Sequence, residues 1–507
     1  MAPHTFEKSI LEGNMEIKAL FQYVEDNAEN LDAYQMEVGI KKYLNRIGVA
    51  AFKGYFAQKG TGDIGDTIKM EDGTVLKKES QFRQKTLFTS FGKLDVPRTC
   101  YRCKGKPGIM PLDAQANLPE KSYSYVLQEY MDILCIRDPF EQSSEVLEKF
   151  LGFKIYPNRL ETVSRDSSTS FDQYYEAKAL PDPESEGSIV VAGFDGIGVP
   201  LIKRESAKII ARKGKGEKRQ KKKEAMVGVS YTVDENIRTP EEVATNLVYP
   251  DQNNDQKNKD NKARAKNIRR LASLERPKLE VFHEIMNHSR ARDPENKKQL
   301  VVVMDGALGL WSILMTFLAS IVFTGILDII HVTEYLWRVA NALYKENSPL
   351  GKKWVYDNLL AILQGRVMDV IDKLSRVLET QKLKKSQRDA VNDCIRYFKN
   401  HLDWMKYDEY LQAGYPIGSG VVESSCGHTV KSRMEGTGRR WTIEGAESIL
   451  LLRSLFTSKD WDEYWQFHMN LERSFYYHDA LAAIGVDDDF DELGRLNKDS
   501  VIPACAA

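Results

Sequence analysis

Two aspartates follow apolar segments in the same way. Asp195 follows SIVVAGF and Asp305 follows QLVVVM, and a glycine comes directly after each aspartate. Both apolar segments are rich in β-branched residues, so each predicts a buried strand that delivers a carboxylate to the rim of a sheet. Carboxylates hold the divalent cations of many phosphoryl-transfer sites. An Asp-Gly pair after a strand is also a common turn, so one pair alone does not establish a site.

A third acid, Glu423, follows the turn-rich segment GYPIGSGVV on a predicted helix. Sites made of carboxylates favour hard cations such as Mg²⁺ or Mn²⁺. Two such ions about 4 Å apart activate an attacking oxygen and stabilise the leaving one. We therefore expect Asp195, Asp305 and Glu423 to be catalytic and to bind two ions, Mg²⁺ or alternatively Mn²⁺, with Asp195 as the shared ligand.

Basic and aromatic residues follow Glu423. At about 100° per helical residue, Lys431 and Arg433 lie about 80° to either side of the direction of Glu423, where they can flank a phosphate backbone. An Arg-Arg-Trp sequence then adds two cations and a flat ring suited to stacking on bases. A solvated basic helix is the alternative. The DNA-binding candidates of this segment are Lys431, Arg433, Arg439, Arg440 and Trp441.

A second basic segment spans residues 203–223. The formal net charge of the chain is -1, so binding of a polyanion requires local concentrations of positive charge. This segment contains eleven Lys or Arg and two Glu, and it follows the Asp195 strand. Its position favours contact with nucleic acid, and a solvated loop or a localisation tag is the alternative. The candidates here are Lys213, Lys215, Lys218 and Arg219.

The N-terminal part of the chain has a mixed pattern. Helical periodicity covers residues 16–46, and alternating residues in 67–103 predict strands with a hairpin turn at Asp72-Gly73. Helical periodicity returns in residues 122–165.

That second helical stretch is interrupted by Leu151-Gly152-Phe153, and Pro157 then opens another helix. Helix, glycine turn and helix resemble a helix-turn-helix, although an ordinary helical hairpin fits equally well. The groove-contact candidates on the second helix are Asn158, Arg159 and Arg165.

The second part of the chain follows a linker at 181–187 and is predicted to contain strands and then long helices. Residues 225–234 predict a strand, and residues 332–412 keep helical spacing. The uncharged segment 306–327 is long enough to cross a membrane, which is one reading of it. Its serines, threonines and glycines favour division into a buried helix at 310–318 and a strand at 326–332.

The six cysteines are too sparse for a disulfide framework, and the N-terminus lacks an apolar signal core. A reducing cytoplasm is therefore expected. Cys100-x-x-Cys103 has no second Cys or His pair at workable spacing, so no zinc site is predicted.

From about residue 85 to residue 478, the chain resembles the bacterial insertion-sequence transposases of the DDE type, and within them the ISKra-type group. The motifs that carry the resemblance are FDGIGVP, KGEKRQKKKEAMVGVSYTVD, VVVMDG, DIIHVTEYLW and GYPIGSGVVESSCGHTVKSRMEGTGRRW. The resemblance implies that Asp195, Asp305 and Glu423 form a metal-binding triad. It also implies that His331, in the motif Asp328-x-x-His331, lies near the site and helps to position DNA.

Relatives tend to have a Cys-x-x-Cys-Gly knuckle near the N-terminal domain, whereas this chain has Lys106 where the partner of Cys103 would fall. This departure puts an N-terminal zinc site in doubt.

The resemblance implies a mixed α/β chain with an RNase H-like catalytic core and an all-helical insertion, preceded by an N-terminal α+β DNA-binding region. We expect these regions: a mixed α/β region (1–118), a helix-turn-helix-like DNA-binding region with linker (119–187), the first part of the core (188–332), the helical insertion (333–412), the rest of the core with Glu423 (413–480) and an acidic tail (481–507).

The expected function is Mg²⁺-dependent cleavage of DNA at transposon ends and strand transfer into target DNA. The expected partners are the terminal inverted repeats and target DNA, bound by a homodimer or a larger synaptic assembly in the bacterial cytoplasm at the nucleoid. Two alternatives stay open: an RNase H-like nuclease or resolvase without strand transfer, and a domesticated DNA-binding protein without chemistry.

Overall fold

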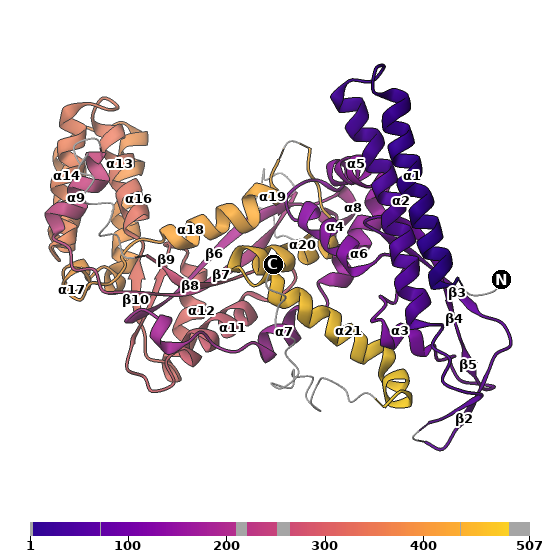
Figure 1. Cartoon of the computed structure of the whole chain (residues 1–507). Helices are drawn as coiled ribbons and strands as arrows, with labels where there is room; N and C mark the ends of the chain where they lie inside the picture. Colours follow the sequence, from indigo (N-terminus) through magenta and orange to yellow (C-terminus); the bar gives the residue numbers. More distant parts are fainter. Residues whose placement is uncertain (1–3, 71, 209–220, 251–263, 437, 486–507) are drawn as a thin grey trace. The chain divides into compact units, whose positions relative to one another are not determined.

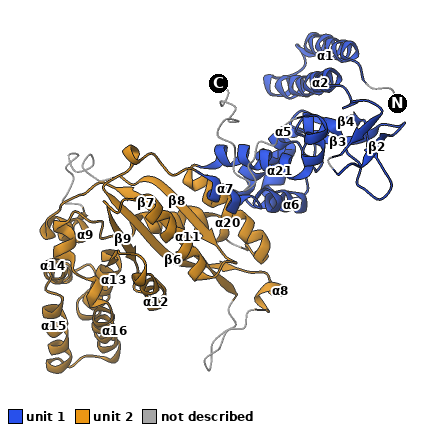
Figure 2. Ribbon diagram, turned by 90° about the horizontal axis from the view of Figure 1, so that it is seen from below, with its two compact units in different colours: residues 1–178, 460–507 blue, residues 179–459 orange. Residues whose placement is uncertain are grey.

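The structure is a computed structural model that describes residues 4–70, 72–208, 221–250, 264–436 and 438–485 (Figure 1). The chain divides into two compact units, one of residues 1–178 with 460–507 and one of residues 179–459 (Figure 2). Both units contain helices and strands, so the fold is mixed α/β.

The first unit begins with a pair of long helices, α1 (Phe6–Asn27) and α2 (Ala33–Lys59), which pack against each other. The side chain of Asp32 caps α2 by accepting a hydrogen bond from the backbone N of Gln35. The strands that follow form a three-stranded sheet and a separate hairpin. Their bounds are β1 (Thr67–Lys69), β2 (Val75–Lys78), β3 (Arg83–Thr89), β4 (Gly92–Arg98) and β5 (Tyr101–Arg102).

The turn predicted at Asp72-Gly73 joins β1 to β2. The two strands pair antiparallel, with Lys69 opposite Val75. Gly73 has a φ of 80°, a left-handed conformation that glycine adopts without steric strain.

Helices complete the first unit. The first of the two helices in the predicted helix-turn-helix ends at Gly152, whose φ of 79° closes it as a left-handed cap. The C-terminal helix α21 belongs to this unit, whereas the sequence prediction assigned residues up to 480 to the core. The helices are α3 (Pro111–Gln115), α4 (Tyr125–Cys135), α5 (Phe140–Leu151), α6 (Pro157–Ser167), α7 (Phe171–Ala177) and α21 (Trp461–Ala483).

The second unit is built on a five-stranded sheet in the order β10-β9-β6-β7-β8. The first three strands of this unit, β6, β7 and β8, pair antiparallel. Strand β9 then pairs parallel with β6, and β10 pairs parallel with β9. Their bounds are β6 (Ile189–Pro200), β7 (Lys222–Val233), β8 (Lys266–Ser273), β9 (Gln299–Met304) and β10 (Thr324–Leu327).

Helices cover both faces of this sheet. Phe194 of β6 stacks on Phe282 of α11 (Lys278–Ala291), with ring centroids 3.7 Å apart. A Cβ at the neighbouring Gly193 would instead meet Val422 of α18 (Gly420–Ser425). Successive strand residues point to opposite faces, so α11 and α18 lie on opposite sides of the sheet.

Between β10 and α18 the described chain is almost entirely helical (Figure 1). The helices are α13 (Ile329–Leu343), α14 (Pro349–Leu363), α15 (Val367–Thr380), α16 (Lys385–His401), the short η4 (Leu402–Trp404) and α17 (Tyr407–Gln412). Helix α9 (Pro240–Val248), from between β7 and β8, packs against α14.

The remaining elements of the second unit are short or lie after the sheet. They are η1 (Pro183–Ser185), α8 (Lys203–Ser206), α12 (Leu308–Met315), η3 (Thr316–Ala319), the π-helix η5 (Cys426–Lys431), α19 (Ser432–Met434) and α20 (Ile443–Ser458).

The uncharged segment 306–327 forms α12, η3 and β10. In the described ranges, no helix has both the length and the apolar character needed to cross a membrane. The strand predicted at 326–332 ends at Leu327 instead, because α13 begins at Ile329.

Candidate metal centre

The sequence predicted Asp195 at the end of its strand, but Asp195 lies within β6. The strand continues to Pro200 because β7 pairs with it along its whole length. Pairing with β9 on the other side stops at Phe194, which lies opposite Met304. Asp195 is therefore the first residue beyond the paired part of β9, at the point where the sheet opens.

Asp305 directly follows β9 and lies beside Asp195 through the same parallel register. Burial raises the pKa of Asp195 above its ordinary value, and the negative charge of Asp305 raises it further. Hydrogen bonds from Cys426 and from the backbone N of Gly196, together with the charge of Lys431, act in the opposite direction. The two predicted aspartates thus form a pair of acids that interact electrostatically.

Helical residues outside the sheet hold the Asp305 turn. The indole Nε1 of Trp311 donates to the backbone oxygen of Asp305 at 2.6 Å, and Trp311 stacks on Trp404 with centroids 3.8 Å apart. His401 Nε2 lies 3.1 Å from the backbone oxygen of Gly306. The C-terminal end of α16 and the following η4 therefore help to fix the position of Asp305.

Asp195 points to the side of the sheet that α18 covers, because it lies two residues after Gly193 on the same strand. The π-helix η5 continues α18 and begins at Cys426. The Cys426 thiol lies 3.3 Å from Asp195 Oδ2, and the backbone N of Gly196 donates to Oδ1 at 2.6 Å. Cys426 therefore connects the helical segment that carries Glu423 to β6, the strand that carries Asp195.

Glu423 is exposed on α18 and lies close to Asp328 and His331. One possible ligand atom from each of these three residues lies within 4.8 Å of the other two. Among the described residues this is the group whose geometry suits a cation by that measure, and it contains Glu423 but neither Asp195 nor Asp305. The structure therefore groups Glu423 with Asp328 and His331, and the triad of Asp195, Asp305 and Glu423 stays a prediction.

Asp328 is fully buried and caps the first turn of α13. Its Oδ1 accepts from the backbone N of Ile330 at 2.9 Å and of Ser419 at 3.2 Å, and its Oδ2 accepts from the Ser419 hydroxyl at 2.5 Å. The same hydroxyl lies 3.4 Å from Glu423 Oε1. Burial raises the pKa of Asp328, and the hydrogen bonds from Ser419 and Ile330 oppose that effect.

Tyr397 of α16 links Asp328 to Asp305. A Cβ at Gly306 would overlap the Tyr397 ring, so the tyrosine packs directly against the residue after Asp305. The hydroxyl is buried and has no hydrogen-bond partner among the described residues. Burial raises the pKa of Tyr397 well above its ordinary range, and the charges of Asp305 and Asp328 raise it further. Tyr397 therefore lies within electrostatic reach of both Asp305 and Asp328.

The donor set of this region fits divalent cations. Carboxylate oxygens are the ligands that Mg²⁺ and Mn²⁺ prefer, and a cation would relieve the repulsion between Asp195 and Asp305. The buried hydroxyl of Tyr397, without a partner in the described chain, is a donor that a bound water or phosphate oxygen could use.

We compared the chain with protein families, curated proteins and solved structures. No family model matches the chain, and no curated protein matches it. A solved structure, the strand transfer complex of the Drosophila P element transposase, has a TM-score of 0.31 and 9% sequence identity, and the match covers 68% of this chain and 94% of that chain. A similarity of this size does not decide the fold or the function.

Two of the residues predicted to contact DNA are buried, which corrects that prediction. Arg433 is 1% exposed, and its guanidinium lies over the ring of Trp441 at 4.5 Å from the centroid. Trp441 is 6% exposed and donates from Nε1 to the backbone oxygen of Met434 at 3.2 Å. Neither side chain offers a surface for a phosphate or a base.

The other basic residues of that segment differ in exposure. Lys431 and Arg440 are exposed, and Arg439 is half-buried and donates to the backbone oxygen of Arg433 at 2.8 Å. Lys431 lies close enough to Asp195 for its charge to lower the pKa of that acid.

The remaining predicted contacts lie elsewhere. Asn158 and Arg159 are exposed on α6, and Arg165 is half-buried. The four basic candidates Lys213, Lys215, Lys218 and Arg219 lie outside the described residues.

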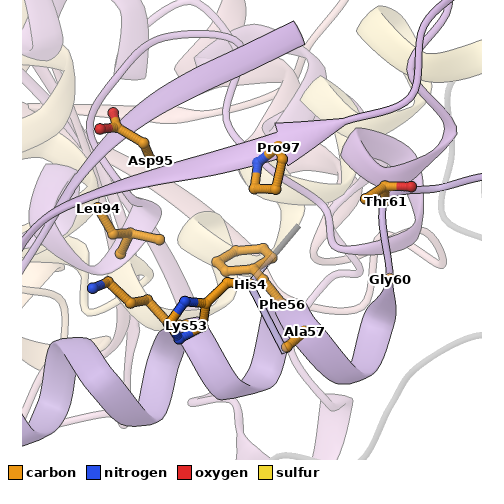
Figure 3. A pocket seen from close by; sticks show the side chains of 9 residues that line it. All are labelled: His4, Lys53, Phe56, Ala57, Gly60, Thr61, Leu94, Asp95 and Pro97. Carbon is orange, nitrogen blue, oxygen red and sulfur yellow. The ribbon is translucent and has the colours of Figure 1, made fainter. Parts of the chain in front are cut away.

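Two further features lie in the first unit. Cys100 is buried and Cys103 half-buried, and neither joins a group of three possible metal ligands within the described ranges. A pocket between α2 and β4 is lined by His4, Lys53 and Phe56, among others, and contains none of the predicted site residues (Figure 3).

Sequence reasoning missed three residues of the centre. Cys426 comes three positions after Glu423, and Ser419 comes four before it, so both were within reach of a helical projection. Tyr397 carries no local signal, because it reaches the acids only through the packing of α16.

Proposed function

We propose that this protein is a DDE transposase that cleaves DNA at transposon ends and transfers the 3′ ends into target DNA. The observation that carries the proposal is the adjacent position of Asp195 and Asp305 at the open end of β6 and β9, with Glu423 joined to them through Cys426. In this proposal the three carboxylates, which come from separate segments, act together on a phosphate at the open end of the sheet.

The sheet supports an RNase H-like core. Three antiparallel strands come first, and two strands parallel to the first of them follow on its other side, as an RNase H-like sheet requires. The helices α13 to α17 lie between Asp305 and Glu423 in the chain, which fits the helical insertion that the ISKra-type resemblance implies. These two features belong together in the proposal.

Two Mg²⁺ ions, when bound by Asp195, Asp305 and Glu423, would supply an activated oxygen nucleophile and stabilise the leaving oxygen. In this proposal Asp195 is the ligand that both ions share. Lys431 is exposed near Asp195 and is positioned to contact a phosphate of the DNA backbone. Cys426 and Gly196 orient the Asp195 carboxylate by donating one hydrogen bond to each of its oxygens.

DNA contacts in this proposal come from exposed cations near the acids and from the first unit. Arg440 and the half-buried His331 lie in the same unit as the acids, and Asn158 and Arg159 of α6 are available for a groove. Because two transposon ends must be joined, we propose a dimer or a larger synaptic assembly, acting in the bacterial cytoplasm at the nucleoid.

The test uses the DNA that flanks the gene of this protein, because a transposase acts on inverted repeats that border its own gene. We expect Mg²⁺-dependent cleavage that leaves 3′-hydroxyl ends, followed by joining of precut ends to a target plasmid. Cleavage without joined product would favour a nuclease or resolvase instead. Binding of the repeats with neither reaction would favour a DNA-binding protein without chemistry.

A further inference from the structure

His331 has the geometry of a metal ligand and not only that of a residue near DNA. Its Nδ1 lies 3.2 Å from Glu334 Oε2. An ionised carboxylate only accepts hydrogen bonds, so in the neutral imidazole Nδ1 carries the proton and Nε2 keeps its lone pair. A histidine that binds a metal characteristically donates from its other nitrogen to a carboxylate in this way.

The Nε2 lone pair faces two carboxylates. Nε2 lies 3.9 Å from Asp328 Oδ2, which is too long for a hydrogen bond, and Glu423 completes the group within 4.8 Å. In the neutral form of His331, two carboxylates and one imidazole lone pair therefore converge, and the Ser419 hydroxyl is a donor beside the two carboxylates. A bound cation would relieve the repulsion between the two negative charges.

Asp328 still has capacity to bind a cation. A carboxylate offers about four acceptor positions, and Asp328 uses two on Oδ1 and one on Oδ2. The free position is on Oδ2, the oxygen that faces His331. Ser419 fixes this carboxylate from the side and brings Glu423 toward it, with its hydroxyl 3.4 Å from Glu423 Oε1.

A separate observation points to a ligand in the same region. The Tyr397 hydroxyl is buried, has no partner in the described chain and senses the charges of both Asp328 and Asp305. Native proteins rarely leave such a hydroxyl unpaired, so a bound water or oxyanion at Gly306, within electrostatic reach of Asp328, would satisfy it. Entry is open, because the side chain of His331 is 34% exposed and Glu423 lies on the surface.

We propose that Asp328, His331 and Glu423 form a mixed nitrogen and oxygen cation site that prefers Mn²⁺ to Mg²⁺. Imidazole suits transition metals, whereas Mg²⁺ prefers oxygen ligands alone. This inference rests on the proposed function for the role of Glu423 and deepens it. The ion on the Glu423 side would have a nitrogen ligand, and the ion between Asp195 and Asp305 would have oxygen ligands only.

The experiment measures Mn²⁺ binding directly, by electron paramagnetic resonance of the metal-free full-length protein. Pulsed spectra report nitrogen atoms coordinated to Mn²⁺, and titration gives the affinity. The variants are His331→Ala, Glu334→Gln and, as a matched control, His428→Ala, which alters an exposed histidine of η5 outside the cluster. Thermal melting of each variant verifies that it is folded.

We expect wild type and His428→Ala to show nitrogen coupling, and His331→Ala to lose it with an affinity for Mn²⁺ that is about 10- to 100-fold weaker. Glu334→Gln should retain the coupling and weaken binding by about 10-fold, as loss of an orienting partner does. The affinity for Mg²⁺ should change less in His331→Ala than the affinity for Mn²⁺.

Nitrogen coupling that persists in His331→Ala, or is absent from wild type, overturns the inference. Because the readout is binding, the outcome is separate from that of the proposed function. If cleavage depends on Asp195 and Asp305 while His331→Ala binds Mn²⁺ normally, the proposed function is supported and this cation site is rejected. If nitrogen coupling to Mn²⁺ is present but no DNA is cleaved, the cation site is supported and the proposed function is rejected.

Discussion

The thiol of Cys426 lies 3.3 Å from Oδ2 of Asp195 and joins the helix of one predicted catalytic acid to the strand of another. Burial raises the pKa of Cys426 well above its ordinary value, and the charges of Asp195 and Glu423 raise it further. The thiol is therefore protonated at neutral pH and donates to the carboxylate. The contact orients the Asp195 carboxylate and couples its position to that of the π-helix η5.

Removal of this donor should impair metal use more than folding. Cys426→Ala is expected to lower the rate of DNA cleavage by about 10-fold and to raise the Mg²⁺ concentration required, because orienting partners of metal ligands have effects of that size. Cys426→Ser keeps a donor and should recover most of the rate. The measurement is cleavage rate against Mg²⁺ concentration, and equal curves for Cys426→Ala and wild type would show that the contact has no role.

Replacing Asp195 by Asn should stabilise the metal-free protein at neutral pH. Burial is the main cause of the raised pKa of Asp195, so the charged form destabilises the folded state. A raised pKa means that the associated stability is present in acid and is lost as the pH rises through the folded-state pKa. We expect Asp195→Asn to melt about 2–4 °C higher than wild type in EDTA at pH 7, the shift produced by about 1 kcal/mol.

Two conditions check that explanation. The difference in melting temperature should shrink as the pH falls and Asp195 of the wild type takes up its proton. Added Mg²⁺ should raise the melting temperature of wild type more than that of Asp195→Asn. A variant less stable than wild type at every pH would contradict this assignment.

Tyr397→Phe should separate a functional hydroxyl from a structural ring. The ring packs against Gly306 and stacks on Tyr335 with centroids 3.9 Å apart, and phenylalanine keeps both contacts. The hydroxyl has no partner in the described chain, so its loss should leave thermal stability unchanged or slightly higher. We expect cleavage to slow by about 10-fold with unchanged DNA binding, and Tyr335→Phe, which also keeps the stack, to cleave at the wild-type rate.

The sequence predicted those elements whose pattern is local. The strand at 225–234 and the helices after Val332 follow from spacing along the chain, and both are present. The position of Asp195 within β6 could not be predicted in this way. The strand continues past Asp195 because it pairs with β7, whose residues lie 22 or more positions later in the chain than their partners. The strand β8 and the helix α11 also gave no pattern that we recognised.

The error at Arg433 has a specific cause. The projection assumed 100° per residue from Glu423 onward, but the π-helix at 426–431 has more residues per turn than an α-helix. Residues after it are rotated relative to that projection, and Arg433 turns toward Trp441 in the interior. Likewise, Asp328 lies close to Glu423 through a contact between segments that involves Ser419 and that no spacing rule anticipates.

The central claim is that Asp195, Asp305 and Glu423 hold the metal ions that cleave DNA. The most direct test is Mg²⁺-dependent cleavage of DNA carrying the ends of the element by Asp305→Ala and Glu423→Ala, with Asp372→Ala, an exposed acid on α15, as the matched control. The account predicts at least a 1,000-fold loss for the first two variants, about 4 kcal/mol of transition-state stabilisation, with DNA binding retained and Asp372→Ala unaffected. Cleavage by either Asp305→Ala or Glu423→Ala at a rate near that of wild type would contradict it.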